Sequence, residues 1–334
     1  MLPTIRPSAE SSRSASRLGD RVRAGILGAV LSMDLGSGAF AQTPDAQANP
    51  LWNVYAAVLR QAKYIDLTHA MAPGGPIGEG FRDFTVGPAL AGVAVPGLVA
   101  RGEPFTYRTL GVAITAYHLP MDHIGTQFGP PAHENEHGAT ISDIPPTVAL
   151  RPLVVVNVVP KVALDPGYQA TVADIQDWER RHGPIPAGSV VMFRSDWSKK
   201  WQDPKRFTTQ PFPGVSLEAL QYLYLDRHVL MQGHEPLDTD NTAPKFIGEK
   251  WLLTHNFAQA EGVANLDQVP ESGALISIGF AKFEGGTGGF ARYVAIAPAN
   301  WPFGVTIDDE SGAPLPTHVH PLRRDADGVL REAR

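Results

Sequence analysis

The sequence predicts an α/β protein. Continuous β-branched runs such as Leu153–Val159 are typical of buried strands, whereas Thr171–His182 has apolar residues at helical spacing. Segments of these two kinds alternate along the chain, which is the pattern of an α/β domain. The chain has 334 residues, of which 43% are apolar, so it can bury a full core although it contains no cysteine.

The folded part is expected to begin with a helix over residues 52–63, where apolar positions recur at helical spacing. The next helix begins at Thr171, a plausible N-cap, and ends before Gly183-Pro184. A third helix, over 216–224, begins at Ser216 with Glu218 in its first turn. Strands are expected over residues 64–69, 107–119 (weakly), 153–159, 189–194, 229–232, 275–280 and 293–296, and the Gly/Pro-rich residues 72–80 are expected to be a loop.

The N-terminus has the features of a secretory signal. Five arginines precede the apolar run Ala24–Met33, and Ala39-Phe40-Ala41 follows, so we expect cleavage after Ala41. The apolar run is too short to span a bilayer permanently. The sequence therefore predicts a signal peptide over 1–41 and a periplasmic or secreted protein; a disordered leader is the alternative.

Composition restricts the partners. The formal net charge is −6 and acids and bases are interspersed, so there is no basic face for nucleic acid or anionic lipid. Without cysteine, a metal must be held by nitrogen and oxygen. We expect a linker over 42–50, one domain over 51–321 and a flexible charged tail over 322–334, with a small molecule as the substrate.

The densest polar cluster lies in the segment Met121–His133. His123 and His133 are ten residues apart across a Gly/Pro-rich stretch that can turn both side chains toward one point. A loop whose histidines bond to backbone carbonyls is the alternative. Against it, the polar groups at 122, 123, 127, 133 and 137 crowd one loop that has no other evident reason to be polar.

This loop resembles the signature His-x-Gly-Thr-His-x-Asp-x-Pro-x-His of the cyclase family, which includes kynurenine formamidase and isatin hydrolase. The matching residues are His123, Gly125, Thr126, Pro131 and His133. Further segments follow in the family's order: Ile65–His69, Gly233–Asp240, Leu252-Leu253 and Glu261–Leu266. The resemblance implies a swivelling β/β/α fold with a mixed sheet flanked by helices, and a homo-oligomer, usually a dimer or tetramer.

The chain departs from the family at several metal ligands. Gln127 and Gly129 replace a histidine and the bridging aspartate, and Glu249 stands at the position of the late histidine. The resemblance then implies one divalent metal held by His123, Gln127, Glu249 and Glu261, and a two-metal site is not expected. This oxygen-rich set favours Mn²⁺ or Mg²⁺, with Zn²⁺ as the alternative. Asp122, His137 and His234 are candidate substitutes for the missing aspartate.

His133 is the candidate for proton transfer. An imidazole titrates near neutrality, so it can take a proton from water and return it to a leaving nitrogen. The matching family histidine implies the same role. A role as a metal ligand or as a support for one is the competing interpretation.

Three further residues are candidates for substrate binding. His234 and Glu235 follow a predicted strand, where sites often lie. Trp197 follows another strand, and either Trp197 or Trp201 could form an aromatic wall for a flat substrate. The alternative for all three is structural, and for Asp238 and Asp240 we prefer structural ties. Residues Gly285–Ala291 have no helix after them, so the sequence predicts a turn beside the site and no dinucleotide loop.

These features predict a metal-dependent hydrolase of C–N amide bonds, arylformamidase-like, acting on an N-formyl arylamine or a cyclic amide. A metal lowers the pKa of a bound water and polarises a carbonyl oxygen. The alternative is a metal-poor small-molecule binding protein, or pseudoenzyme, on the same fold. Cyclisation or dehydration would use the same site and is not separable by sequence.

Overall fold

The computed structural model describes residues 49–78, 80–307, 315 and 322–332, and Asn49–Arg334 forms one compact unit. The predicted signal peptide over 1–41 lies outside the described residues, as does nearly all of the linker over 42–50. Within the described part, no helix combines the length and the apolar character needed to cross a membrane.

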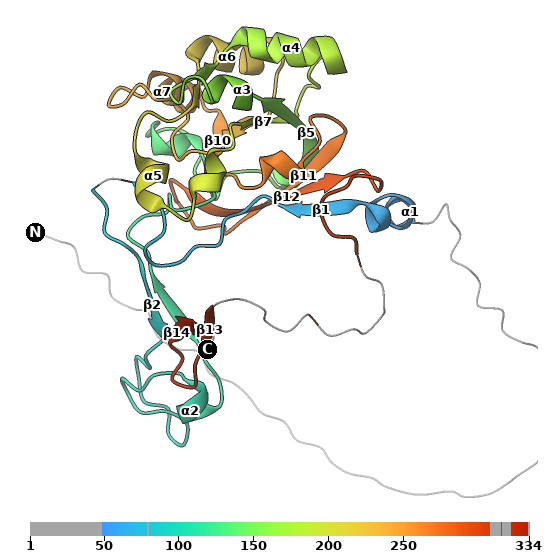
Figure 1. The fold of residues 1–334 in the computed structure, drawn as a ribbon. Helices are drawn as coiled ribbons and strands as arrows, with labels where there is room; N and C mark the ends of the chain where they lie inside the picture. The colour runs from blue at the N-terminus through green and yellow to red at the C-terminus, as the bar shows by residue number, and fades with distance from the viewer. Residues whose placement is uncertain (1–48, 79, 308–314, 316–321, 333–334) are drawn as a thin grey trace, which may run out of the picture. The chain divides into compact units, whose positions relative to one another are not determined.

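An eight-stranded mixed sheet forms the centre of the fold (Figure 1). Its strand order is β1-β12-β11-β5-β7-β9-β10-β4, and β4 also pairs with β12, so all strands except β1 close into a ring. Neighbours from β5 to β10 are parallel and the other pairs are antiparallel. The strands are β1 (Lys63–Asp66), β4 (Gln127–Gly129), β5 (Leu150–Asn157), β7 (Val190–Arg194), β9 (Met231–His234), β10 (Ala258–Glu261), β11 (Ala274–Phe280) and β12 (Gly289–Ala297).

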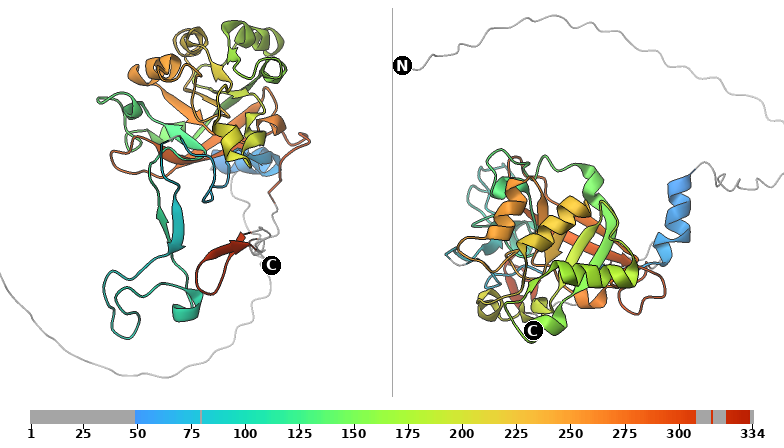
Figure 2. Two further views of the ribbon diagram at one scale, coloured as in Figure 1. Left: turned by 60° about the vertical axis from the view of Figure 1, so that its left-hand side comes forward. Right: turned by 90° about the horizontal axis from the view of Figure 1, so that it is seen from above.

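The central strands β5 and β7 bury side chains on both faces of the sheet, since successive side chains point to opposite sides. In β5, Leu153 and Val155 belong to one apolar cluster, whereas Val154 and Val156 belong to a second cluster with the helices. Figures 1 and 2 show α3, α4, α6 and α7 gathered on one side of the strands. These helices are α3 (Val159–Val162), α4 (Val172–His182), α6 (Leu217–Gln221), which continues as the π-helical turn η5 (Tyr222–Asp226), and α7 (Ile247–Thr254).

Shorter elements complete the chain. The remaining helices are α1 (Pro50–Ala57), α2 (Tyr107–Leu110) and α5 (Pro204–Thr208). The single turns are η1 (Leu59–Gln61), η2 (Pro131–His133), η3 (Pro146–Ala149), η4 (Trp197–Lys200) and η6 (Leu266–Gln268). Two-stranded pairs join β2 (Thr85–Pro88) to β3 (Thr115–His118), β6 (Gln169–Ala170) to β8 (Gly214–Val215), and β13 (Leu322–Arg324) to β14 (Leu330–Glu332).

Most of the long predicted elements are confirmed, with their ends shifted by a few residues. The start of the predicted strand 107–119 is wrong: the Thr106 hydroxyl accepts a hydrogen bond from Thr109 N at 3.1 Å, so a turn of helix forms before β3. The predicted tail contains a β-hairpin. Asp325 Oδ1 accepts hydrogen bonds from the backbone N–H groups of Asp327 and Val329, and this turn joins β13 to β14.

Candidate functional site

The loop before β4 and the turn after it bring the two signature histidines together. His123 precedes β4, and His133 ends η2. Their ring centroids are 3.9 Å apart and the ring planes are tilted by 39°. The structure therefore brings the two imidazoles together, as the sequence predicts.

Asp122 orients the first of these imidazoles. Its Oδ1 lies 2.8 Å from His123 Nδ1, and its Oδ2 accepts hydrogen bonds from Thr287 N and Gly288 N at 2.9 and 2.8 Å. Burial raises the pKa of Asp122, but the neighbouring His123 and the Gly288 N–H outweigh that effect and hold it below its usual value. A carboxylate at Nδ1 favours the tautomer with its proton there, so Nε2 carries the free lone pair.

The glycine-rich turn fits closely against the His123 ring. A Cβ at Gly288 would lie 2.6 Å from His123 Cε1, so any side chain there would displace the imidazole. The segment Gly285–Ala291 lies beside the site, as the sequence predicts, and its turn also supports the His123 ring. Burial, followed by the proximity of His133, lowers the pKa of His123 to about 4.

His133 lies on the solvent side of the pair. The residue is exposed overall, yet desolvation of its ring by the surrounding loop lowers its pKa below 6.5. At neutral pH it is therefore an uncharged base with access to solvent, which suits proton transfer.

Three buried polar atoms in and beside this loop have no hydrogen-bond partner in the described structure: His69 Nε2, His123 Nε2 and Gln127 Oε1. His69 is the one that the sequence did not single out. Its backbone N–H donates to Thr126 Oγ1 at 2.9 Å, and its ring stacks on Trp201 with centroids 4.0 Å apart. The available signal was its place at the end of Ile65–His69, one of the segments that follow the family's order.

A chain of amides and carboxyls continues from the loop into the interior. Gln127 lies opposite Glu261 in the pairing of β4 with β10, and Gln127 Nε2 donates to Glu261 Oε2 at 2.6 Å. Gln259 Nε2 donates to Glu261 Oε1 at 2.8 Å and to Glu249 Oε1 at 3.0 Å. The sequence did not single out Gln259.

The pKa values of Glu249 and Glu261 are both raised, which favours the protonated carboxyls. Burial, and then the nearby Asp238, raises the pKa of Glu249 to about 8. Burial, and then Glu249 itself, raises the pKa of Glu261 well above its usual value. The side-chain partners of each carboxyl are amide N–H donors, which compensate an anion less than a cationic side chain would.

The predicted metal ligands therefore divide into two parts. The loop part fits a cation, because His123 Nε2 and Gln127 Oε1 are buried free acceptors and the carboxylate at His123 Nδ1 is a usual partner of a ligating histidine. The carboxyl part does not fit as arranged, because Glu249 and Glu261 are engaged by amide N–H groups. Among the described residues, no three His, Asp or Glu side chains form a group that could hold a metal.

His234 and Glu235, two of the predicted substrate-binding residues, are tied to the protein. His234 is 2% exposed and lies between Pro236 O and Thr239 Oγ1, and the cavity it lines has a volume of only about 10 Å³. Glu235 is fully buried and accepts hydrogen bonds from Ser195 N, Ser195 Oγ and Trp197 N. Both arrangements correspond to the structural alternative.

Trp197 and the candidate substitutes for the missing aspartate lie in different environments. Trp197 is buried and donates its indole N–H to Phe207 O at 2.9 Å, so it packs in the core, and Trp201 is the indole beside the loop. The His137 side chain is 87% exposed, with its ring 3.5 Å from Glu136 Oε1. Asp240 stabilises the start of α7, because Gly248 N and Glu249 N both donate to its Oδ2. This is the structural role expected for Asp240 from the sequence.

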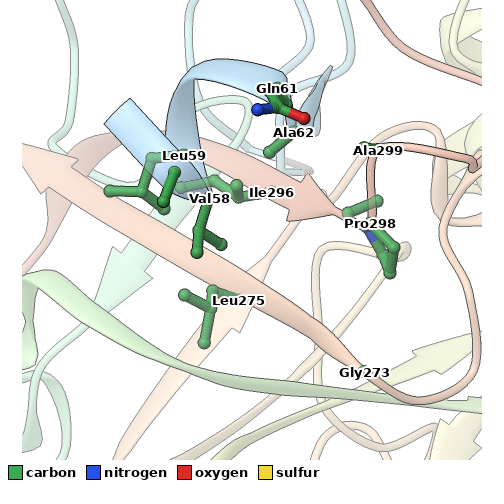
Figure 3. Close-up of a pocket in the computed structure, with 11 residues that line it drawn as sticks. Val58, Leu59, Gln61, Ala62, Gly273, Leu275, Ile296, Pro298 and Ala299 are labelled. Atoms are coloured by element: carbon green, nitrogen blue, oxygen red, sulfur yellow. The ribbon is translucent and has the colours of Figure 1, made fainter. Parts of the chain in front are cut away.

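An apolar pocket of about 410 Å³ lies elsewhere, between α1–η1 and the strands β11 and β12 (Figure 3). Val58, Leu59, Leu275 and Ile296 line it together with small residues and one polar side chain, that of Gln61. None of the candidate site residues reaches it, and it has no titratable side chain, so it offers no chemistry.

Comparisons with known proteins identify the family, and the matched region contains the signature loop. Residues 65–241 match the family model described as Putative cyclase. An isatin hydrolase from Roseibium aggregatum is 31% identical over 193 residues, which cover 53% of this chain and 72% of that protein.

Solved structures show the same fold. Isatin hydrolase A from Ralstonia solanacearum superposes with a TM-score of 0.61 at 26% identity, covering 78% of this chain and 100% of that one. A structure described as a predicted metal-dependent hydrolase from Bacillus stearothermophilus has a TM-score of 0.51 at 18% identity, covering 70% of this chain and 98% of that one.

Proposed function

Because this chain belongs to the cyclase family and its relatives are hydrolases, we propose that it hydrolyses the C–N bond of a cyclic amide such as isatin. The observation that carries the proposal is the Asp122–His123–His133 cluster. It places an oriented imidazole with a free Nε2 against a second, solvent-accessible imidazole. An N-formyl arylamine, the other substrate class expected from the sequence, contains the same kind of bond.

His133 acts as the base in this proposal. Its neutral ring takes a proton from the attacking water while the water oxygen bonds to the carbonyl carbon. When the C–N bond breaks, the protonated ring returns that proton to the leaving nitrogen, so no other proton donor is needed. His123, held by Asp122 through Nδ1, keeps its Nε2 lone pair free.

One divalent metal, Mn²⁺ in preference to Zn²⁺, belongs to the proposal. His123 Nε2 and Gln127 Oε1 would hold it, because both are buried and have no other partner. When bound, such an ion polarises a carbonyl and lowers the pKa of water.

A small-molecule binding protein without catalysis is the second candidate. The specific observation in its favour is that Glu249 and Glu261 already have amide partners, so the interior half of the expected metal site is internally satisfied. The chemistry of a hydrolase would then be absent while the fold is kept.

The test is isatin hydrolysis by wild type, His133→Ala and His137→Ala, with metal content measured on each. His137 is a matched control, since it lies four residues from His133 and its side chain is 87% exposed. We expect His133→Ala to lower turnover by about 10²–10⁴-fold at unchanged metal content, and His137→Ala to behave as wild type. Joint loss of metal and activity would make His133 a ligand. A metal-replete wild type that binds isatin without turnover would favour the binding protein.

We further propose that the protein is exported to the periplasm or secreted. The support is the basic stretch, the apolar run and the Ala-x-Ala end of residues 1–41. N-terminal sequencing of mature protein should find a start near Gln42, and retention of Met1 would contradict export.

A further inference from the structure

Gln259 and Gly129 are direct partners in the pairing of β10 with β4. A Cβ at residue 129 would lie 2.8 Å from Gln259 Cγ and 3.3 Å from its Nε2. Gly129 does not have a positive φ, so its backbone conformation does not require glycine. What the position requires is room, because the Gln259 side chain occupies the space where a side chain of residue 129 would begin.

Every polar atom of the Gln259 side chain has a partner. Its Nε2 donates to Glu249 Oε1 and Glu261 Oε1, and its Oε1 accepts a hydrogen bond from Thr239 Oγ1 at 2.6 Å. The side chain is fully buried. An amide NH₂ group has two hydrogens, and here each is directed at a different carboxyl. The Oε1 atoms of Glu249 and Glu261 therefore already face an amide donor, and a cation between the two carboxyls would have to displace the Gln259 amide.

We propose that Gln259 closes the Glu249–Glu261 pair to metal ions, so that, among the described residues, a divalent cation is left with the loop donors His123 and Gln127. Gly129 and Gln259 then act as a matched pair: the missing side chain of one makes room for the amide of the other. Metal binding and thermal stability are measured without substrate, so the closure can be tested independently of the proposed hydrolysis.

Titration of the metal-free full-length protein with Mn²⁺, and separately with Zn²⁺, tests the closure calorimetrically. Wild type should bind no more than one ion, and Glu249→Gln should leave that binding unchanged. Gln259→Ala should open the pair and bind Mn²⁺ about 10–100-fold more tightly, or bind an additional ion.

Gln232→Ala is the matched control for this titration. Gln232 is also a fully buried glutamine that contacts Thr239 Oγ1, at 2.9 Å, and its side-chain amide donates there instead of to a glutamate. The control should bind metal as wild type does. Equal binding by Gln259→Ala and the control, or loss of wild-type binding in Glu249→Gln, would overturn the proposal.

A second measurement remains available if Gln259→Ala fails to fold. Gln259→Glu keeps the shape of the side chain but places a third carboxyl against Glu249 and Glu261, so its Tm should fall without metal and recover with Mn²⁺. Gly129→Ala should lower the Tm by roughly 2–8 °C through overpacking, and less so when combined with Gln259→Ala. A Gln259→Glu protein whose Tm ignores Mn²⁺, with no coupling between positions 129 and 259, would refute the closure.

Discussion

Two glycines at this site are explained by the space that a neighbouring side chain occupies. Gly288 allows the His123 ring to lie against the backbone, and Gly129 allows Gln259 to reach two carboxyls. Neither glycine has a positive φ. Each is therefore explained by a side chain that belongs to a distant part of the sequence.

Glu249 makes stability depend on pH in a defined direction. Its pKa is raised from 4.5 to about 8 in the folded protein, so the folded state keeps a proton that the unfolded chain releases above pH 4.5. Its contribution to stability is complete below pH 4.5 and is lost as pH rises through 8. The glutamine of the Glu249→Gln variant cannot titrate. The free energy of unfolding of wild type minus that of the variant should therefore decrease as the pH is raised from about 5 to about 8. Urea denaturation at both values measures it, and a pH-independent difference would contradict the assignment.

The sequence predicted the loop residues better than the interior ones. His123 and His133 are ten residues apart in one Gly/Pro-rich loop, so local geometry alone brings them together. The partners of Glu249 and Glu261 depend on Gln259, which looks like an ordinary polar strand residue until the β4–β10 register is known. No local pattern gives that register.

At the scale of elements, the site depends on two strands that are too short to show a period. β4 has three residues and β10 has four, and neither was predicted. Alternation along β10 nevertheless explains the site, because Gln259 and Glu261 share one face while Ala260 joins the apolar cluster on the other. Helix α7 then brings Glu249 to the polar face.

Asp240 should be the main support of α7. Its Oδ2 accepts the N–H groups of Gly248 and Glu249 at 2.7 and 2.9 Å, and the residue is 1% exposed. Asp240→Ala would leave two buried N–H groups without a partner, so we expect a loss of about 2 kcal/mol or more from the free energy of unfolding.

Asp203→Ala is the control for this loss, because Asp203 caps the short helix α5 at an exposed position through Arg206 N at 3.1 Å. It should cost about 0.5–1 kcal/mol. Equal losses in the two variants, measured by urea denaturation, would show that burial of the α7 cap adds nothing.

At the scale of the whole molecule, the α/β class followed from the sequence, but the closure of the sheet did not. The long strands β5, β7, β11 and β12 are largely apolar runs that any buried sheet would contain. The ring is completed by β4, which pairs with β10 on one side and with β12 on the other. A three-residue strand with two distant partners is a tertiary feature, and only the folded chain reveals it.

The expected homo-oligomer is a property of the whole molecule that an exposed apolar segment supports. Between residues 90 and 119, nine large apolar side chains are exposed: Leu90, Val93, Val95, Leu98, Tyr107, Val112, Ile114, Tyr117 and Leu119. Monomeric proteins rarely leave such a concentration uncovered. We therefore expect a dimer or tetramer in sedimentation velocity, with this segment at the contact.

The double variant Val93→Asp/Leu98→Asp should dissociate that oligomer, because each aspartate would bury a charge against a partner's apolar surface. These side chains are 70% and 60% exposed in the subunit, so the substitutions should not unfold it. The Tm should fall only by the part that association contributes. Leu164→Asp is the control, since Leu164 is 90% exposed and lies outside the segment. It should sediment as wild type does. A wild-type protein that sediments as a monomer at all concentrations would contradict the oligomer, and a double variant that stays associated would move the contact to another surface.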